Sequence, residues 1–318
     1  MKKVLIIAPD YMGYMEKVGH HLRKTTGIEV IDIHIPTYKY PSVFTKISNF
    51  FLKRLGKDVK FAYREKYIKD IIGNQTFDVT LIVRPDHLSE STLLQLKSQS
   101  LHFKSYFYDG VHRFPKKLKS VPYFDKIYSF EPSDCAEFGF ELITNFIYDE
   151  QPLITPTPQF KYSVFNISSH DRQRFPLLLK IAASIKKQGL TYKIIIKTNK
   201  KLNDEGLVTF IKEPMSLMEI KELLQDSACM LDLGVIRKHK GLTFRVFEAM
   251  GLHKKIITNN PDIAHYDFYD PQNILIIDEE SLALPKTFLT SAYRPIPEPI
   301  YQKYTLDSWV KRVFAEVL

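Results

Sequence analysis

The fold of this chain is decided by one stretch, Lys238-His-Lys-Gly-Leu-Thr-Phe-Arg-Val-Phe-Glu248-Ala-Met-Gly-Leu-His-Lys-Lys-Ile-Ile-Thr-Asn-Asn260. Its pattern predicts a glycine-led loop, a helix with a polar first turn, and then a buried strand. A helix N-terminus attracts anions because its first N–H groups point outward, and Gly241 lets a ligand approach the backbone closely. One interpretation is a site for a ligand with phosphates and hydroxyls, bound through Thr243, Arg245 and Glu248. The other is an ordinary amphipathic helix with an Arg–Glu pair on its surface.

The composition is that of a soluble globular protein. The chain has 318 residues, of which 44% are hydrophobic and 25% charged, so there is room for one large or two ordinary domains. The net charge of +9 favours anionic partners such as nucleotides, phospholipid headgroups, acidic polysaccharide or nucleic acid.

The cysteine count and the N-terminus both predict a cytoplasmic protein. Cys135 and Cys229 form neither a disulfide framework nor a metal-ligand spacing, which is typical of a reducing compartment. The apolar run at the N-terminus ends at Pro9 and Asp10, too early for a signal peptide. No segment approaches 18 consecutive apolar residues, so we expect no membrane-spanning helix.

Short apolar runs alternate with helical segments in two series. The first series predicts strands at Val4–Ala8, Glu29–His34, Phe77–Val83, Ser105–Tyr108 and Lys126–Phe130, with a helix at Tyr11–Lys24. The second predicts strands at Tyr162–Asn166, Tyr192–Lys197, Cys229–Leu233, Lys255–Thr258 and Ile274–Ile277, with helices at Phe175–Gln188 and Ser216–Asp226. In the latter helix, Ser216 and Glu219 form a predicted capping box.

A proline-rich break at Gln151–Phe160 separates the two series and reads as a linker. The layout predicts an α/β protein of two doubly wound Rossmann-like domains that face each other across a cleft. We expect residues 1–155 to form the first domain and residues 156–290 the second. Residues 291–318 form a connection and a terminal helix, with Asp307 as its N-cap, that packs back on the first domain.

The segment from Ser42 to Gly73 is the most basic part of the chain. Its apolar residues recur at helical spacing: Phe44, Ile47, Phe50, Phe51 and Leu55. One interpretation is an interfacial membrane contact made by Phe50, Phe51, Lys53 and Arg54. The other is a helix that packs on the sheet and keeps a solvated lysine face.

Several motifs that would define other functions are absent from the sequence. There is no Gly-x-Gly-x-x-Gly after the first strand and no P-loop, which removes the main support for a dinucleotide oxidoreductase or a P-loop ATPase. The HExxH, CxxC and GxSxG motifs are missing, as are recognised nucleic-acid-binding signatures. The positive net charge is therefore the only feature of the sequence that favours nucleic-acid binding.

What remains are polar residues at the predicted carboxyl ends of strands, where open α/β sheets bind their ligands. In the second domain, Ser168 and Arg172 suit either a phosphate or simple helix capping. In the first domain, Asp10, Asp86 and Asp109 each follow a strand, and one of them is a candidate general base toward a hydroxyl. Asp109 suits equally well a purely structural role in holding its loop.

Several of these segments resemble a family of bacterial glycosyltransferases that act in lipopolysaccharide-core and capsule biosynthesis and have the two-domain GT-B fold. The resemblance is carried by His239–Gly251, Lys254–Asn260, Tyr266–Ile274, Tyr108-Asp109 with Arg113, and Phe124–Asp134. It is distributed from Tyr106 to Ile277, and the basic segment Ser42–Gly73 contributes nothing to it.

The resemblance implies that the second domain binds a nucleotide-sugar and that the first domain holds a glycan or glycolipid acceptor. It implies that Glu248 binds hydroxyls of the donor, and that Arg245 and Thr243, beside Gly241 and Lys240, lie near its diphosphate. The chain departs from the family at His239, where the family carries glutamine. Lys240 stands where many retaining GT-B enzymes have a second glutamate, which favours an inverting mechanism.

The sequence therefore predicts a metal-independent glycosyltransferase without a cofactor, acting on a bacterial surface glycan. Its partners would be the donor, the acceptor and, through the basic segment, the anionic inner face of the cytoplasmic membrane, with no nucleic acid. The alternative is a non-catalytic nucleotide-sugar-binding or scaffold protein of the same fold.

Overall fold

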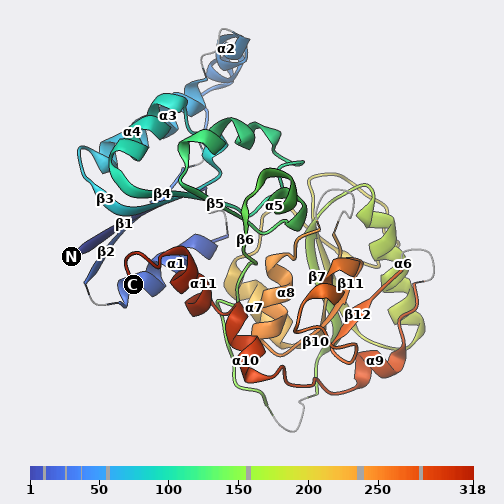
Figure 1. The fold of residues 1–318 in the computed structure, drawn as a ribbon. Coiled ribbons are helices and arrows are strands. Elements are labelled where there is room, and N and C mark those ends of the chain that lie inside the picture. Colours follow the sequence, from blue (N-terminus) through green and yellow to red (C-terminus); the bar gives the residue numbers. More distant parts are fainter. Residues whose placement is uncertain are drawn as a thin grey trace. The chain divides into compact units, whose positions relative to one another are not determined.

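The computed structural model describes residues 1–9, 12–25, 27–36, 38–54, 58–154, 159–234, 240–278 and 282–318, with Lys53 by its backbone only. Two compact units are present (Figure 1). Unit 1 comprises Met1–Ile143 and Val310–Leu318, and unit 2 comprises Thr144–Trp309. The division falls between Ile143 and Thr144, and residues 155–158 of the predicted linker lie outside the described residues.

Unit 1 is built on a six-stranded parallel sheet in the order β2-β1-β3-β4-β5-β6. The strands are β1 (Lys2–Ala8), β2 (Ile28–His34), β3 (Phe77–Val83), β4 (Ser100–Phe107), β5 (Lys126–Ser129) and β6 (Glu141–Leu142). The α-helices are α1 (Tyr14–Arg23), α2 (Val43–Arg54), α3 (Val59–Ile72), α4 (Glu90–Ser98) and α5 (Pro132–Phe138), with 3₁₀ segments η1 (Pro85–His87) and η2 (Pro115–Tyr123). The strand order reverses between β1 and β3, so this is the topological switch point of the unit.

Unit 2 also has a six-stranded parallel sheet, in the order β12-β11-β10-β7-β8-β9. The strands are β7 (Tyr162–Ser169), β8 (Tyr192–Lys197), β9 (Thr209–Ile211), β10 (Ser227–Asp232), β11 (Lys255–Thr258) and β12 (Ile274–Ile276). The helices are α6 (Arg174–Lys187), α7 (Leu217–Gln225), α8 (Phe244–Gly251), α9 (Lys286–Thr290) and α10 (Glu298–Tyr301), with 3₁₀ segments η3 (Pro261–His265) and η4 (Gln302–Tyr304). The switch point of this sheet lies between β7 and β10.

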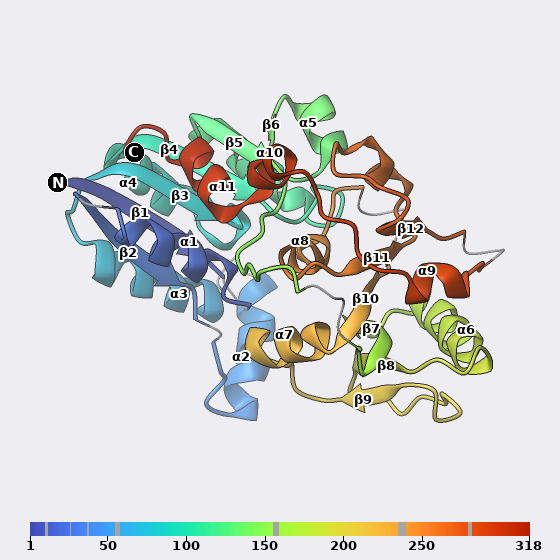
Figure 2. The same ribbon diagram turned by 90° about the horizontal axis from the view of Figure 1, so that it is seen from below.

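Helices cover both faces of each sheet, as parallel strands require. In unit 1, α3 and α4 lie on one face, and α1 lies on the other with the end of the last helix, α11 (Leu306–Val313), of which Val310–Val313 belong to this unit (Figure 2). In unit 2, α6 and α9 pack on one face of the sheet through a shared apolar cluster, and α7 and α8 lie on the other. The strands are continuous apolar runs because they are buried on both faces; Val4 to Ala8 are at most 2% exposed. The two predicted Rossmann-like domains are thus confirmed.

Local signals were correct in some places and incomplete in others. The predicted capping box of α7 is present: Ser216 Oγ accepts from the N–H of Glu219, and the Glu219 carboxylate accepts from the N–H of Ser216 at 2.7 Å. The prediction that Asp307 caps the last helix was wrong. That helix begins at Leu306, and Thr305 Oγ1 accepts from the N–H of Ser308 at 3.3 Å, so Asp307 lies inside the first turn.

Some elements carried too weak a pattern to be predicted. Strand β4 begins at Ser100 rather than Ser105 because its first half is partly solvated, with Leu101 74% exposed. The short strand β9 and the helices α4 and α5 were not predicted. Among the described residues, no helix is long and apolar enough to cross a membrane.

Candidate functional site

The carboxyl ends of β7 and β10 are tied together at the switch point of unit 2. Arg174, at the start of α6, donates to the carbonyl of Ser169 at 2.5 Å and to the carbonyl of Leu233 at 2.9 Å. Buried Asn166 on β7 donates to the carbonyl of Leu231 at 2.7 Å. These bonds make a rigid edge, which is where open α/β sheets place their ligands.

The start of α8 is anchored to the same edge by Thr243. Its hydroxyl accepts from the N–H of Arg245 at 3.2 Å, as an N-cap does, and donates to Asp232 Oδ2 at 2.9 Å. Burial raises the pKa of Asp232, while the bond from Thr243 and the charge of Arg245 act against that rise. The Thr243 hydroxyl therefore fixes α8 to the end of β10.

The carboxylate of Glu248 is buried and held from two sides. Tyr148 donates its hydroxyl to Glu248 Oε1 at 2.8 Å, and the Arg245 guanidinium pairs with Glu248 Oε2. The Glu248 side chain is only 5% exposed, against 17% for Arg245. The Arg–Glu pair of the second interpretation exists, but it does not lie on the surface as that interpretation expected.

Gly251, the last residue of α8, allows the segment that carries Tyr148 to approach Glu248. A Cβ atom at Gly251 would lie 2.1 Å from the carbonyl oxygen of Asp149 and 2.7 Å from a methyl of Ile147. The carbonyl of Gly251 accepts from the N–H of Gln151 at 3.0 Å. The segment Ile147–Gln151 therefore lies directly on the end of α8, which brings Tyr148 to Glu248.

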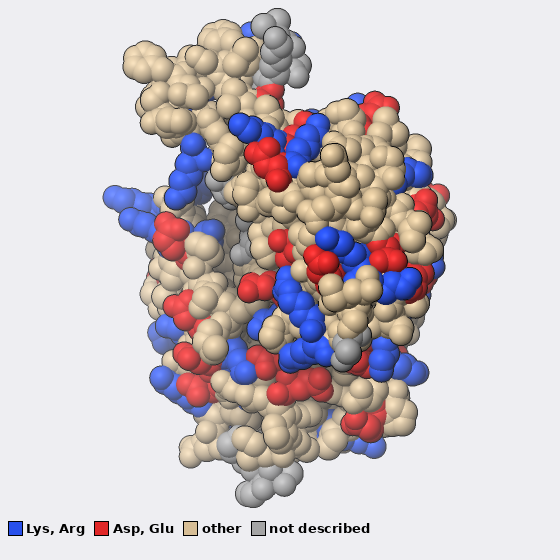
Figure 3. All heavy atoms as spheres, turned by 90° about the vertical axis from the view of Figure 1, so that its left-hand side faces the viewer, with Lys and Arg blue, Asp and Glu red and all other residues tan. Residues whose placement is uncertain are grey.

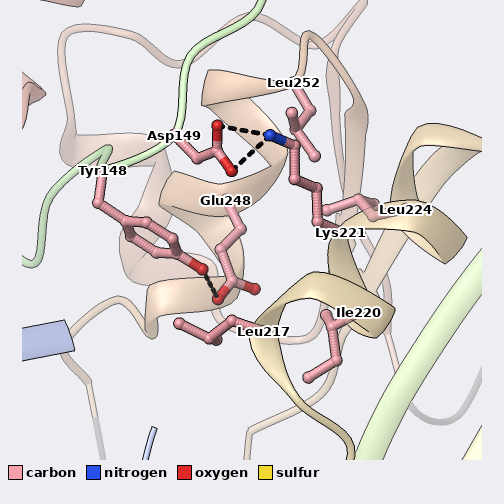
Figure 4. Close-up of a pocket in the computed structure, with 8 residues that line it drawn as sticks. All are labelled: Tyr148, Asp149, Leu217, Ile220, Lys221, Leu224, Glu248 and Leu252. Atoms are coloured by element: carbon pink, nitrogen blue, oxygen red, sulfur yellow. Dashed lines mark hydrogen bonds and ion pairs between the residues drawn. The ribbon is translucent and has the colours of Figure 1, made fainter. Parts of the chain in front are cut away.

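A small pocket adjoins the Glu248 carboxylate, between α8 and α7 (Figure 4). Tyr148, Glu248 and the ion pair of Lys221 with Asp149 form its polar part. The apolar part consists of Leu217, Ile220, Leu224 and Leu252. Its free volume of about 10 Å³ is room for one water, so it is a packing gap and does not hold a nucleotide.

The remaining predicted donor residues border the same edge of the unit 2 sheet. Ser168 is on β7 and donates to Asn166 Oδ1 at 3.3 Å, and Arg172 is exposed in the loop before α6. Gly241 is buried and Lys240 is exposed, with its carbonyl accepting from Asn260 Nδ2 at 2.8 Å. Thr243, Arg245 and Glu248 are linked to one another by hydrogen bonds, and we call them the linked group. Ser168 and Arg172 lie at the carboxyl end of β7 and in the loop that follows it.

In unit 1, Arg84 brings two of the three predicted carboxylates together. Its guanidinium donates two hydrogen bonds of 2.9 Å to the two carboxylate oxygens of Asp86 and lies 3.7 Å from Asp109 Oδ2. The same group stacks on the ring of Phe114, 3.7 Å from its centroid. Arg113 donates to Asp109 Oδ1 at 3.0 Å. Arg84 has φ of 62°, a strained backbone that is common at functional sites. The third carboxylate, Asp10, lies outside the described residues.

The charges around Arg84 set the protonation of their neighbours. Burial alone would raise the pKa of Asp86, but the bonds and charge of Arg84 outweigh it and hold that pKa below its ordinary value. Burial lowers the pKa of His87 to about 4 and that of fully buried Lys117 to about 8. Lys117 donates to the carbonyl of Asp109 at 2.6 Å. Asp86 is therefore a firmly ionised carboxylate and a weak proton acceptor.

A cavity of about 250 Å³ opens beside Asp86. It is lined from η1, α4 and η2 by Pro85, Asp86, Leu88, Glu90, Leu93, Lys116, Lys119, Ser120 and Tyr123. The volume is slightly below the range of about 300–1,000 Å³ usual for ligand pockets, and the wall mixes both charges with hydroxyls. Such a wall suits a small polyhydroxylated ligand better than an apolar one. The part of the chain that the structure describes contains no cluster of three or more His, Cys, Asp or Glu able to hold a metal ion.

Sequence reasoning missed Tyr148, Asp232, Arg174 and Arg84. Asp232 was within reach, because it is the polar residue that ends an apolar strand, the same signal that selected Asp86. Arg84 likewise follows β3 directly. Tyr148 carries no local signal, since its partner Glu248 lies 100 residues further along the chain.

Comparison with known proteins shows the fold and leaves the family open. No family model matches this chain, and no curated protein matches it in sequence.

Solved structures match the chain over nearly its whole length. A UDP-GlcNAc 2-epimerase from Neisseria meningitidis, bound to UDP-GlcNAc, superposes with a TM-score of 0.56 at 11% identity, covering 99% of this chain and all of that one. A glycosyltransferase from Rickettsia africae gives 0.55 at 12% identity, covering 99% and 97%. A lipopolysaccharide outer core galactosyltransferase gives 0.53 at 12% identity, covering 99% and 100%. With two Rossmann-like units and neighbours of this kind, the chain has the GT-B fold, which glycosyltransferases share with UDP-sugar epimerases.

Proposed function

We propose that this protein transfers a sugar from a nucleotide-sugar donor to a glycan or glycolipid acceptor. The observation that carries the proposal is the linked group at the start of α8, in which Glu248 is buried and oriented by Tyr148 and Arg245. A carboxylate held in one orientation is suited to accept hydrogen bonds from the ribose or sugar hydroxyls of a donor. From the sequence resemblance to lipopolysaccharide-core and capsule glycosyltransferases, we further propose that the acceptor is a lipopolysaccharide or capsule glycan on the cytoplasmic side of the membrane.

The proposed reaction is a direct displacement that inverts the anomeric carbon and needs no metal. A carboxylate of unit 1 takes the proton of the acceptor hydroxyl, whose oxygen attacks the anomeric carbon as the nucleoside diphosphate leaves. Arg245, Lys240 and the N-terminus of α8 stabilise the negative charge that grows on the phosphate. We assign the base to Asp109, because Arg84 bonds both oxygens of Asp86 at 2.9 Å but lies 3.7 Å from Asp109 Oδ2.

The first experiment is a thermal-shift screen with UDP-, GDP-, dTDP- and CMP-sugars. A donor that binds only the native state at about 100 times its Kd stabilises the fold by about 2.7 kcal/mol, so it should raise the melting temperature clearly. If none of the four classes stabilises the protein, the nucleotide-sugar proposal is wrong.

Product analysis with the stabilising donor then separates three activities. Mass growth of an added glycan acceptor, with release of the nucleotide, supports transfer. Conversion of the donor sugar to an isomer without any acceptor would assign the protein to the epimerases that share its fold. Donor binding without chemistry would identify a non-catalytic binding protein.

Substitutions test the individual roles. Arg245→Ala should lower kcat about 100-fold, as loss of one transition-state charge contact does elsewhere. The matched control is Arg294→Ala, since the Arg294 side chain is 66% exposed and, within the described residues, pairs with Asp270 at 3.5 Å. Asp109→Asn should abolish turnover and leave the donor-induced thermal shift intact. If Asp86→Asn abolishes turnover and Asp109→Asn does not, the base assignment moves to Asp86.

A further inference from the structure

Helix α2 turns its apolar side toward solvent. Five large apolar residues of this twelve-residue helix are between 51% and 82% exposed: Val43, Phe44, Ile47, Phe50 and Phe51. At roughly 100° per residue, these positions fall within about a third of the helix circumference. They form one continuous stripe, which we call the α2 stripe.

The opposite side of α2 is anchored by a polar residue. Asn49 is 1% exposed; it donates to the Tyr40 hydroxyl at 2.8 Å and to Asp58 Oδ1 at 3.0 Å, and accepts from the N–H of Val59 at 2.8 Å. These three bonds fix the rotation of the helix about its axis. The usual amphipathic arrangement, with apolar residues inward and polar residues outward, is therefore reversed.

Basic residues accompany the stripe. The sequence of α2 contains Lys46, Lys53 and Arg54 and no aspartate or glutamate. The exposed Arg54 guanidinium lies 5.1 Å from the Phe50 ring centroid. Figure 3 shows the projection that α2 forms at the top of the view as mostly uncharged surface with few basic atoms at its edge. A continuous exposed apolar patch of this kind marks an interaction surface.

The next helix, α3, carries exposed aromatic residues of its own. Tyr63 and Tyr67, one turn apart on α3, are 44% and 38% exposed, with exposed Lys66 between them. Aromatic side chains of this type are enriched where an apolar phase meets water, because the ring is apolar and the hydroxyl needs a partner. Both helices of this basic part of the sequence thus expose aromatic rings, but the surface argued for below is the α2 stripe alone.

We propose that the α2 stripe docks on the surface of an anionic lipid bilayer, with the phenylalanines in the interfacial region and Lys46 and Arg54 at the headgroup phosphates. Apolar insertion combined with attraction to anionic lipid is the physical basis of interfacial helices. A second copy of the chain fits less well, since a self-complementary contact would bring the like charges of two α2 helices together. The segment lies outside the part of the chain that resembles glycosyltransferases, so this inference does not depend on the proposed function.

Vesicle flotation of the full chain tests the proposal. We expect the protein to float with phosphatidylglycerol-containing vesicles at low salt, with binding weakened by high salt. The variant Phe44→Ser/Phe50→Ser/Phe51→Ser should lose about ten-fold or more in partition, since each phenylalanine contributes apolar area to insertion. The matched control, Leu94→Ser/Leu101→Ser, alters exposed leucines elsewhere in unit 1 and should bind as the unaltered chain does.

Fluorescence reports insertion directly. The single tryptophan, Trp309, is buried and gives a constant background. Phe50→Trp should shift its emission to the blue with anionic vesicles and be quenched by brominated lipid, while Leu101→Trp should not. Equal binding to neutral phosphatidylcholine vesicles would overturn the choice of an anionic bilayer. Absence of vesicle binding would overturn the proposal that the α2 stripe docks on a membrane. A concentration-dependent dimer that the serine variant does not form would show instead that the stripe is an interface between two copies of the chain.

Discussion

At the scale of single residues, buried charges define both candidate sites. Glu248 is nearly inaccessible to solvent, and an isolated carboxylate there would be costly. Tyr148 and Arg245 offset that cost and set its orientation. Arg84 plays the corresponding part in unit 1, where it serves two carboxylates at once.

The Tyr148 hydroxyl should therefore matter for stability. Tyr148→Phe keeps the ring and removes one hydrogen bond to a buried charge, which costs about 2 kcal/mol. Urea denaturation should show that loss. The control Tyr63→Phe, at an exposed position, should change the unfolding free energy by less than about 0.5 kcal/mol. If the unfolding free energy of Tyr148→Phe equals that of the unaltered chain, the hydrogen bond from Tyr148 to Glu248 does not stabilise the fold.

His87 should make the protein sensitive to mild acid. Burial, together with the positive charges of Arg84, Arg64 and Lys117, lowers its folded pKa from 6.5 to about 4, against the opposing charge of Asp86. Because the folded pKa lies below the unfolded one, protonation of His87 favours the unfolded state. The free energy of unfolding therefore has its full value above about pH 6.5 and decreases as the pH falls toward about 4. After allowance for partial exposure, we expect a loss of about 1–2 kcal/mol between about pH 7 and pH 5.

Urea denaturation at the two pH values measures this loss. His87→Gln should reduce the difference by about the same amount, whereas His20→Gln, at an exposed position on α1, should leave it as it is. A difference that persists in His87→Gln would show that other groups cause it.

At the scale of elements, α8 depends on contacts at both of its ends. Thr243 caps its first turn and ties it to β10, and Gly251 admits the segment Ile147–Gln151 against its last turn. The conformation of the candidate site thus depends on one hydroxyl and on the absence of one methyl group.

Gly251→Ala should be strongly destabilising. Its Cβ would overlap backbone at Asp149, which cannot move as a flexible side-chain end does, so we expect a loss of about 2–3 kcal/mol and weaker donor binding. Gly234→Ala is the matched control, because among the described residues its Cβ would meet Asn259 Oδ1 alone, at an ordinary 3.9 Å. Comparable melting temperatures for the two variants would contradict the close approach.

At the scale of the whole molecule, the chain leaves unit 1 after Ile143 and returns to it at Val310. The returning residues are secured by Lys104, which is 3% exposed and donates to the carbonyl of Val313 at 2.7 Å and to Glu316 Oε2 at 2.6 Å. Phe314 is completely buried beside them. Unit 1 is therefore not complete without the C-terminal end of the chain.

Glu316→Ala should consequently destabilise unit 1, because it removes a partner of the buried Lys104 ammonium. Removal of one partner of a fully buried pair costs about 3–5 kcal/mol; with Glu316 30% exposed, we expect about 2 kcal/mol. Arg312→Ala breaks the solvent-exposed pair with Glu141 and should cost less than about 1 kcal/mol. Denaturant titration compares them, and equal effects would mean that the Lys104 contact is not a stabilising one.

Prediction from the sequence succeeded where a local pattern reports a local environment. The continuous apolar strands revealed parallel sheets, and the recurrence of that pattern after a proline-rich break revealed two Rossmann-like domains. Thr243, Arg245 and Glu248 were selected because they follow a glycine at a helix start. The α2 stripe was visible as a period, but the same period fits a buried face and an exposed one equally well.

What the sequence alone determined is therefore the order of strands and helices and the neighbourhood of the candidate site, since burial on both faces and helix capping leave signatures within a few residues. The tertiary structure decided which of these side chains are buried, which are exposed and which partners they bind. It buried the Arg245–Glu248 pair by bringing Tyr148 from 100 residues away, joined Asp86 and Asp109 through Arg84, and turned the α2 stripe outward through Asn49. The Tyr148–Glu248 contact joins residues 100 apart in the chain, so no local pattern of residues records it. The partners of Asn49 are only nine or ten residues away, but a helical period does not say which side of the helix those bonds hold inward.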